Sequence, residues 1–209
     1  MRLVFVHGWA LGPEIWDNVS PLLGRYPQLR VDLGFFGAPG LPEFLPGDIL
    51  VGHSAGLLWG LRQRDDWAGA VAINSFSRFC LDAQGRGCVR PAALRAMQKS
   101  LAQDAEACVG NFRASIGAPP AKSPAQAAPL ADGLALLRDF DAAPHPRGKP
   151  WLVLASQDDA LAPPAEAENL ARAASGQLVL SAAGGHGLPW TAPKFCAGRI
   201  EDFLRAHAF

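Results

Sequence analysis

The chain has 209 residues, a length that usually forms one domain. Hydrophobic residues make up 49% of it and charged residues 18%, a composition that excludes intrinsic disorder. Nineteen Lys and Arg residues balance 19 Asp and Glu residues, and a net charge of zero argues against general binding of nucleic acid, which needs a basic surface. No apolar stretch reaches the roughly 18 residues of a membrane span, and no secretory leader is recognisable. We therefore expect a cytoplasmic protein that binds neither nucleic acid nor membrane.

The four cysteines contain no C-x-x-C pair, which fits free thiols in a reducing compartment. No cluster of His, Cys, Asp or Glu has the spacing of metal ligands. The sequence therefore predicts no metal site and no cofactor.

Short apolar runs alternate with helical periods along the chain, which indicates β-α-β units and a parallel sheet. The predicted strands are 3–6, 29–33, 48–51, 70–73, 151–155 and 177–180. The predicted helices of this core are 15–23, 55–64, 164–174 and 194–207. The rule of right-handed crossovers predicts the spatial order 2-1-3-4-5-6, with helices on both faces of the sheet.

Two segments interrupt the alternation. Residues 34–47, with four glycines and three prolines, predict a bare loop where a crossover helix would be expected. Residues 77–149 contain no strand candidate; they hold a long helical region at 90–116, an Ala/Pro-rich stretch and a short helix at 131–140. Long insertions in compact domains are usually functional. We expect a core made of residues 1–76 and 150–209 and a helical lid at residues 77–149.

The sequence GHSAG at residues 52–56 matches the pattern G-x-S-x-G. It directly follows a predicted strand and directly precedes a predicted helix, the context of a nucleophile elbow. Small residues are needed there because larger side chains would clash in so tight a turn. The pattern makes Ser54 the candidate nucleophile.

A serine hydroxyl needs a base within hydrogen-bond reach, and the base needs an acid that orients it. Among the five histidines, His186 lies in a glycine-rich loop between the last predicted strand and the last helix, where ligands meet an open α/β sheet. His145, by contrast, lies in a proline-rich loop. We take His186 as the base. Asp158 and Asp159 both follow the fifth strand, and position alone does not separate them as the acid.

Stabilising the tetrahedral intermediate requires two backbone N–H groups that point at its oxygen. One is expected from Ala55, after the nucleophile, and the other from Trp9 in the loop after the first strand. His7 in the same loop is expected to support that loop through a hydrogen bond rather than to bind a metal.

These motifs resemble the α/β-hydrolase superfamily and, within it, the pimeloyl-[acyl-carrier protein] methyl ester carboxylesterases of biotin synthesis. The matching stretches are VFVHGWALGPEIWD, LVGHSAG, NFRASIG, ADGLALLRDFD, SQDDALAPP and GGHGLPWTAPKFC. The acid of the superfamily is typically the aspartate of D-x-x-x-P, a pattern that Asp159 satisfies and Asp158 does not. The resemblance thus implies a catalytic triad of Ser54, His186 and Asp159.

The resemblance further implies a substrate, the methyl ester of a pimeloyl chain carried on acyl-carrier protein. It implies contacts with that substrate at His186, Trp9, Ala55 and, along the lid helix, Phe112, Arg113, Ala114, Ser115 and Ile116. Phe112 and Ile116, four residues apart, are expected to present one helical face toward Ser54. Five cations against Asp82 within residues 78–99 could meet the acidic carrier protein, the expected contacts being Arg90, Arg95 and Lys99.

Two other functions are compatible with the same sequence. The first is a general short-chain carboxylesterase whose lid only shapes an acyl pocket. The second is a binding protein of the hydrolase fold without catalysis, which would be expected to lack a member of the triad or a glycine of the elbow. All of these are present in this chain.

Overall fold

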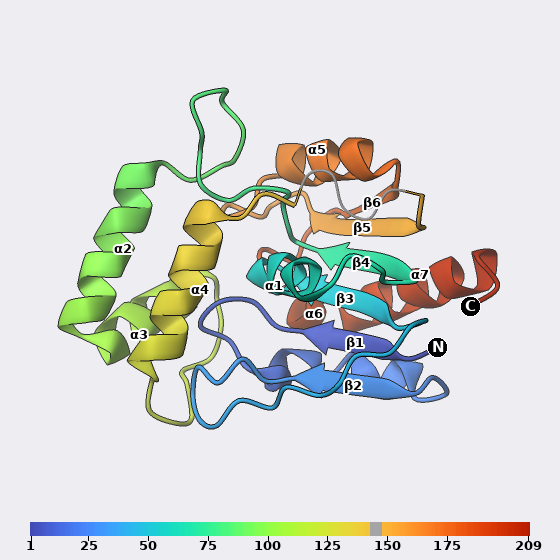
Figure 1. Ribbon diagram of the computed structural model, residues 1–209, viewed down its shortest axis with the longest axis horizontal. Coiled ribbons are helices and arrows are strands. Elements are labelled where there is room, and N and C mark those ends of the chain that lie inside the picture. The colour runs from blue at the N-terminus through green and yellow to red at the C-terminus, as the bar shows by residue number, and fades with distance from the viewer. Residues whose placement is uncertain (143–147) are drawn as a thin grey trace.

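The computed structural model describes residues 1–142 and 148–209 (Figure 1). The part of the predicted lid at residues 143–147, with His145, lies outside the described residues. No helix in the described ranges is both long and apolar enough to cross a membrane.

Six strands form one sheet in the order β2-β1-β3-β4-β5-β6, with every neighbouring pair parallel. This confirms the predicted topology. The strands are β1 (Leu3–Val6), β2 (Gln28–Val31), β3 (Ile49–His53), β4 (Gly69–Ile73), β5 (Trp151–Ser156) and β6 (Gln177–Ser181). The central strands are continuous apolar runs because both of their faces are buried.

Alternate residues of each strand enter two separate apolar cores, since side chains of a strand point to opposite faces. In β1, for example, Val4 and Val6 contact one core, whereas Leu3 and Phe5 contact the other. The first core is covered by α1 (Ala55–Gln63) and α5 (Pro164–Ala174). The second is covered by α7 (Pro193–Ala206), preceded by the short helix α6 (Leu188–Thr191).

The predicted helix at 15–23 is wrong: the structure has two short 3₁₀ helices, η1 (Pro13–Trp16) and η2 (Ser20–Leu23). Pro21 explains the break, because a proline inside a helix removes a backbone donor and its ring clashes with the preceding turn. Both short helices still bury apolar residues against the second core, so the apolar spacing was informative although the helix type was not.

The predicted helical region at 90–116 is two helices, α2 (Pro91–Gln103) and α3 (Ala105–Ser115). They meet at Asp104, whose backbone is extended (φ −156°) and whose carboxylate accepts a hydrogen bond from the Ala107 amide at 2.9 Å. An aspartate with that geometry is an N-cap, which starts a new helix. A third helix, α4 (Ala127–Asp139), begins four residues earlier than the predicted 131.

Helices α2, α3 and α4 gather beyond the carboxyl ends of the strands, on the side opposite both chain termini (Figure 1). The predicted lid therefore lies at the sheet edge where open α/β proteins bind ligands. The division into core and lid stays a prediction.

The turn between β3 and α1 depends on glycine at two positions. A Cβ atom on Gly52 would lie 2.4 Å from the Cα atom of Leu57, and one on Gly56 would lie 2.3 Å from the carbonyl oxygen of Val6. Since both obstacles are backbone atoms, no side-chain rotation could relieve the overlap.

We expect Gly56→Ala to lower the free energy of unfolding by about 2 kcal/mol or more, because helix α1 would have to move away from β1. Gly110→Ala in α3 is the matched control, since a Cβ atom there meets nothing within 4 Å. That change should stabilise the protein by about 0.5 kcal/mol. Urea titration of the three proteins measures both effects, and equal stability of Gly56→Ala and the unchanged protein would contradict the close approach.

Candidate active site

Ser54 occupies the sharp turn between β3 and α1 with a positive φ of 52°. Such a backbone angle is strained for a residue other than glycine and persists only when the surroundings enforce it. Two hydrogen bonds hold Ser54 in this conformation, one with β4 and one with Ser75, which follows shortly after β4. The Ser54 amide donates to the Ile73 carbonyl at 3.0 Å, and the Ser75 hydroxyl donates to the Ser54 carbonyl at 2.8 Å. The turn presents the Ser54 hydroxyl at the carboxyl edge of the sheet.

The structure brings Ser54, His186 and Asp159 together, as the sequence predicts. His186 Nε2 lies 3.0 Å from Ser54 Oγ, and His186 Nδ1 lies 2.8 Å from Asp159 Oδ2. The three residues are 6%, 4% and 3% exposed, respectively. If Nδ1–H donates to the carboxylate, Nε2 is free to accept the proton of the serine hydroxyl. This is the geometry of a nucleophile, its base and an orienting acid.

The two neighbouring aspartates differ in what they contact. Asp159 Oδ1 accepts hydrogen bonds from the amides of Leu161 and Ala162 at 2.9 and 3.0 Å, which leaves Oδ2 for His186. Asp158 instead accepts from the Ser156 hydroxyl and from the Gly185 amide at 2.7 Å, and these bonds lower the pKa of its carboxyl. Asp158 therefore supports the loop that carries His186 without touching the histidine ring.

The His186 loop is also held by two side chains that the sequence analysis did not single out. His53 Nε2 donates to the His186 carbonyl at 2.8 Å, and Asn74 Nδ2 donates to the Gly185 carbonyl at 2.6 Å. His53 is fully buried, and burial holds its pKa well below the ordinary value of 6.5. A neutral His53 carries one ring proton, and the short contact places that proton on Nε2. His53 directly precedes Ser54, so the nucleophile turn itself positions the backbone of the base.

The two predicted oxyanion donors come from different segments: Trp9 lies in the loop after β1, and Ala55 is the first residue of α1, directly after Ser54. Neither the Trp9 amide nor the Ala55 amide donates a hydrogen bond within the described residues. Gly8 allows the approach, since a Cβ atom there would lie 3.1 Å from Ser54 Cβ. His7 stabilises the loop: its Nε2 accepts from the Leu33 amide at 3.0 Å and its Nδ1 donates to the Gly8 carbonyl at 3.0 Å. Both amides are therefore available to an oxygen placed at Ser54.

Arg113, which the family resemblance suggested as a substrate contact, has a different role in the structure. It is 2% exposed and donates to the carbonyls of Pro119 and Ala10 at 2.6 and 2.9 Å. It also lies 3.4 Å from Glu14. A buried guanidinium needs such partners, and they occupy its donors. Arg113 thus connects α3 to the loop that carries Trp9 and is not free to bind a substrate.

The expectation that Phe112 and Ile116 share one face toward Ser54 also fails. Helix α3 ends at Ser115, so Ile116 leaves the helical spacing and packs into the second core. Phe112 packs into the first core, with its ring edge-on to Trp9 at 4.9 Å between centroids. Of the predicted substrate contacts, Trp9 and Ala55 line the cavity described next, whereas His186 and residues 112–116 are not among its lining residues.

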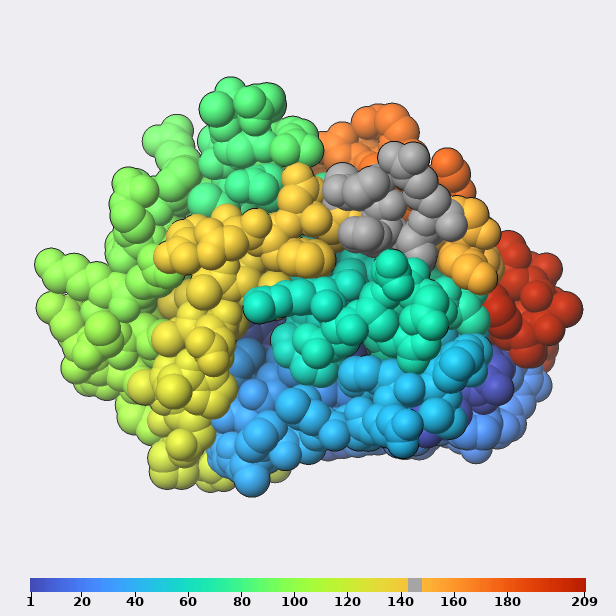
Figure 2. Space-filling view, viewed as in Figure 1, coloured from blue at the N-terminus to red at the C-terminus, as the bar shows by residue number. Residues whose placement is uncertain are grey.

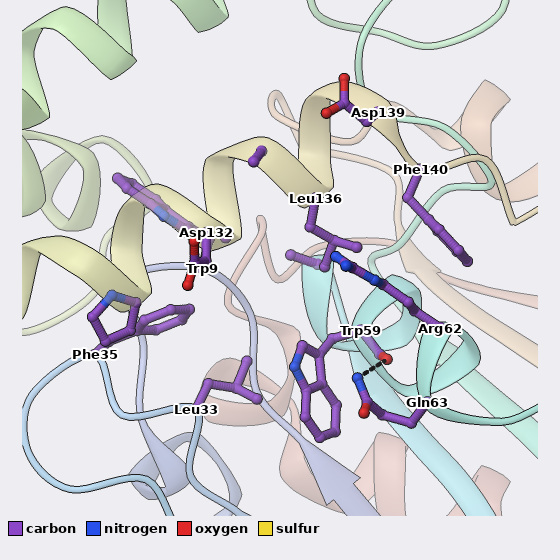
Figure 3. Close-up of a pocket in the computed structure, with 14 residues that line it drawn as sticks. Trp9, Leu33, Phe35, Trp59, Arg62, Gln63, Asp132, Leu136, Asp139 and Phe140 are labelled. Carbon is purple, nitrogen blue, oxygen red and sulfur yellow. Dashed lines mark hydrogen bonds between the residues drawn. The ribbon is translucent and has the colours of Figure 1, made fainter.

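A cavity of about 730 Å³ opens between α1 and α4, and its lining includes Trp9 and Ala55 but neither Ser54 nor His186. Figure 2 shows the corresponding hollow between the teal and yellow segments. Its lining combines apolar side chains with four polar side chains from the two helices (Figure 3). The apolar side chains include Trp9, Leu33, Phe35, Trp59, Leu136 and Phe140, and the polar ones are Arg62, Gln63, Asp132 and Asp139. Apart from Ala55, the lining residues on α1 and α4 were not predicted from the sequence. Those on α1 follow Ala55 at helical spacing.

No group of three or more His, Cys, Asp or Glu side chains within residues 1–142 and 148–209 is placed to hold a metal ion.

Comparison of the sequence with protein-family models gives no match. Pimeloyl-[acyl-carrier protein] methyl ester esterase of Sodalis glossinidius (strain morsitans) is 33% identical over 129 residues, which are 53% of this chain and 50% of that protein. The chain thus spans half the length of this curated relative.

Solved structures match nearly the whole chain at low identity. A bromoperoxidase from Bacillus anthracis has a TM-score of 0.81 at 17% identity, covering 98% of this chain and 91% of that one. An esterase from Exiguobacterium antarcticum has a TM-score of 0.81 at 16% identity, covering 98% and 92%. An enol-lactonase from Burkholderia xenovorans has a TM-score of 0.79 at 15% identity, covering 98% and 91%.

These likenesses and the parallel sheet show that the protein has the α/β-hydrolase fold, as the sequence predicts. Over half of its length, the sequence is similar to the pimeloyl-[acyl-carrier protein] methyl ester esterase. The same fold serves a bromoperoxidase, an esterase and a lactonase, so the chemistry has to be argued from the site.

Ser54→Ala and His186→Ala should each lower kcat on p-nitrophenyl butyrate by about 10⁴-fold or more, and the double variant should be no slower than either. Asp159→Asn should lower kcat by about 10³-fold because His186 would lose its orienting acceptor. Asp158→Asn is the matched control and should be mild, since an amide oxygen still accepts from Gly185. Steady-state rates test these values, and a severe Asp158→Asn with a mild Asp159→Asn would reverse the assignment.

His53→Leu should lower kcat by about tenfold, because the His186 carbonyl would lose its buried donor and the loop its position. His53→Gln keeps a donor near Nε2 and should retain most activity. A further readout is the pH profile of kcat: because His53 stays neutral, the profiles of the unchanged protein and His53→Gln should have the same inflection. A shifted inflection in His53→Gln would mean that His53 itself titrates in the working range.

Proposed function

We propose that the protein is a serine carboxylesterase that works through an acyl-enzyme intermediate. The observation that carries this proposal is the hydrogen-bonded chain from Ser54 through His186 to Asp159, placed beside two backbone amides without acceptors. The similarity to a curated methyl ester esterase supports the same class of reaction. A binding protein without catalysis would have no reason to retain the strained Ser54 turn and the full set of partners.

In the first half-reaction, Ser54 Oγ attacks the ester carbonyl carbon while His186 Nε2 takes the hydroxyl proton. The carbonyl oxygen becomes an oxyanion, which the amides of Trp9 and Ala55 stabilise. Asp159 stabilises the imidazolium through its hydrogen bond to Nδ1. The C–O bond of the tetrahedral intermediate then breaks, and the alcohol leaves with the proton from His186.

In the second half-reaction, His186 takes a proton from water, and the hydroxide attacks the acyl carbon bound to Ser54. The collapse of this intermediate releases the carboxylic acid and returns the proton to Ser54. The base must be neutral at both attacks, because only a neutral imidazole can accept the proton.

We further propose the methyl ester of a pimeloyl chain on acyl-carrier protein as the substrate, with methanol as the leaving alcohol. The name of the curated relative supports this choice. The apolar walls of the cavity suit methylene groups, each of which gains about 0.8 kcal/mol on burial. The carrier protein would stay outside, against α2.

The cations on α2 support a role for an acidic partner, although fewer are free than the sequence suggested. Arg78 and Arg86 are paired with Asp82 and Asp141. Within the described residues, three exposed cations form no ion pair on or next to α2: Arg90, Arg95 and Lys99. A cluster of unpaired surface cations attracts an acidic protein and raises its association rate.

Reversing charge at Arg95 and Lys99 together, with Arg95→Glu and Lys99→Glu, should lower kcat/KM for the carrier-bound methyl ester by about tenfold at low salt. The same protein should hydrolyse p-nitrophenyl butyrate at the normal rate, because the small ester does not contact α2. Raising the salt concentration should reduce the difference between the two proteins.

Lys194→Glu with Arg199→Glu on α7 is the control, because it makes the same change in net charge on the other face of the sheet. Equal loss on both substrates would indicate damage to the fold of α2. No loss on the carrier-bound ester would favour the second candidate, a general short-chain carboxylesterase, which the open mouth of the cavity also accommodates.

A further inference from the structure

One face of helix α1 lines the cavity and changes its chemistry along its length. The lining residues Ala55, Trp59, Arg62 and Gln63 follow the spacing i, i+4, i+7 and i+8, which places them on one stripe of the helix. The stripe begins at Ala55 beside the nucleophile, continues with the apolar ring of Trp59, and ends with the polar side chains of Arg62 and Gln63. The deep end of the cavity is therefore apolar and the outer end carries a cation.

The guanidinium of Arg62 is unpaired. Within the described residues it takes part in no ion pair, donates no hydrogen bond and lies over no aromatic ring. The neighbouring Arg64 differs, since Asp66 accepts from its Nη2 at 2.7 Å. In Figure 3 the Arg62 side chain extends into the cavity, between Leu136 above it and the Trp59 ring below it.

Two carboxylates lie on the α4 side of the same mouth, and they are not equivalent. Asp139 points away from the cavity in Figure 3 and is paired with Arg138 at 2.6 Å. Asp132 is exposed and is the carboxylate that faces the opening. It lies across the mouth from Arg62 without forming an ion pair with it, so the cation stays available for a ligand.

We propose that Arg62 binds an anionic group at the far end of the acyl chain, so that the preferred substrates are esters of acyl chains that end in a negative charge. The inference rests on the proposed ester hydrolysis alone, and it names a class of substrate that differs from the carrier-bound pimeloyl ester, whose acyl chain ends in a neutral thioester. The ester carbonyl lies at Ser54 and the oxyanion donors, the methylene groups lie against Trp59 and Leu136, and the anion meets the guanidinium.

The length of the helix sets the reach of this substrate. Arg62 follows Ser54 by eight residues, which at a rise of about 1.5 Å per residue is about 12 Å along the axis. Side chains of a helix lean toward its N-terminus, so the guanidinium lies closer to Ser54 than its Cα atom does. With C–C bonds of about 1.5 Å, the five bonds of a six-carbon acyl chain reach at most about 7.5 Å, and the lean of the guanidinium toward Ser54 shortens the remaining distance.

The test compares three p-nitrophenyl esters of equal chain length: the neutral hexanoate, the anionic monoester of adipic acid and the cationic 6-aminohexanoate. We expect kcat/KM for the anionic ester to exceed that for the neutral ester by about tenfold, the effect of one charge-assisted hydrogen bond. Arg62→Gln should remove this preference, and Arg62→Lys should keep part of it.

Asp132→Asn should raise the preference for the anionic ester, because it removes the opposing charge at the mouth. Arg199→Gln on α7 removes the same charge as Arg62→Gln on the other face of the sheet and should leave the preference unchanged. An equal kcat/KM for the anionic and neutral esters, an unchanged preference in Arg62→Gln, or a preference for the cationic ester would each overturn the proposal.

The source of the anion is resolved with a second pair of substrates, the methyl ester of a pimeloyl chain on phosphopantetheine and on pantetheine, which lacks the phosphate. A sensitivity to Arg62→Gln with the first compound alone would overturn the proposal, because the pantetheine arm places the phosphate far beyond the end of the acyl chain. A sensitivity confined to the adipate ester assigns it to a carboxylate at the chain end. No sensitivity in either pair contradicts anion binding at Arg62.

Binding separates this proposal from the proposed activity. In the Ser54→Ala protein, calorimetric titration should find tighter binding of monomethyl adipate than of dimethyl adipate, and Arg62→Gln should abolish the difference. If the unchanged protein hydrolyses no ester but this binding difference holds, the esterase function fails and the anion site stands. If esters are hydrolysed and the binding difference is absent, the anion site alone fails.

Discussion

The active centre depends on a close approach between backbones at the start of α1. Gly56 lies against the carbonyl oxygens of Val6 and His7, and Gly52 lies against the backbone of Leu57. This contact forces the chain to reverse within one residue, and Ser54 takes the strained angle that the reversal requires. The same contact brings the loop after β1 beside Ser54. The nucleophile and the proposed oxyanion donors are therefore positioned by the same backbone packing.

Around that turn, polar groups join segments far apart in the chain. His53 from the turn, Asn74 after β4 and Asp158 after β5 all bind the backbone of the loop at 185–186. Asn74 also accepts from the Ser156 amide at 3.0 Å, which links the ends of two strands. The position of His186 thus depends on three strand ends of one parallel sheet, and its loop has little freedom to move on its own.

The strands and the triad were predictable from the sequence because each has a local signature. Continuous apolar runs marked the strands, and the G-x-S-x-G pattern marked the turn. Asp159 was separated from Asp158 only by the resemblance to the superfamily, whose acid is typically the aspartate of D-x-x-x-P. The lid contacts were not predictable, because they depend on where α3 ends and on which residues Arg113 meets. Sequence similarity placed Arg113 in a binding role, whereas its burial in the folded chain gives its donors to carbonyl groups. The cavity needed the packing of α1 against α4, which no local pattern encodes.

Trp9 links the oxyanion loop to the helix above it, since its indole Nε1 donates to the Leu130 carbonyl of α4 at 2.8 Å. Gly133 allows α4 to pack closely on the Trp9 ring, because a Cβ atom on Gly133 would lie 2.6 Å from Cδ1 of Trp9. Outward movement of α4 would therefore break this hydrogen bond and disturb the residue whose amide is proposed to bind the oxyanion. A substrate that enters through the gap between α1 and α4 would leave the contact intact. In that case, the width of the gap limits which acyl chains reach Ser54.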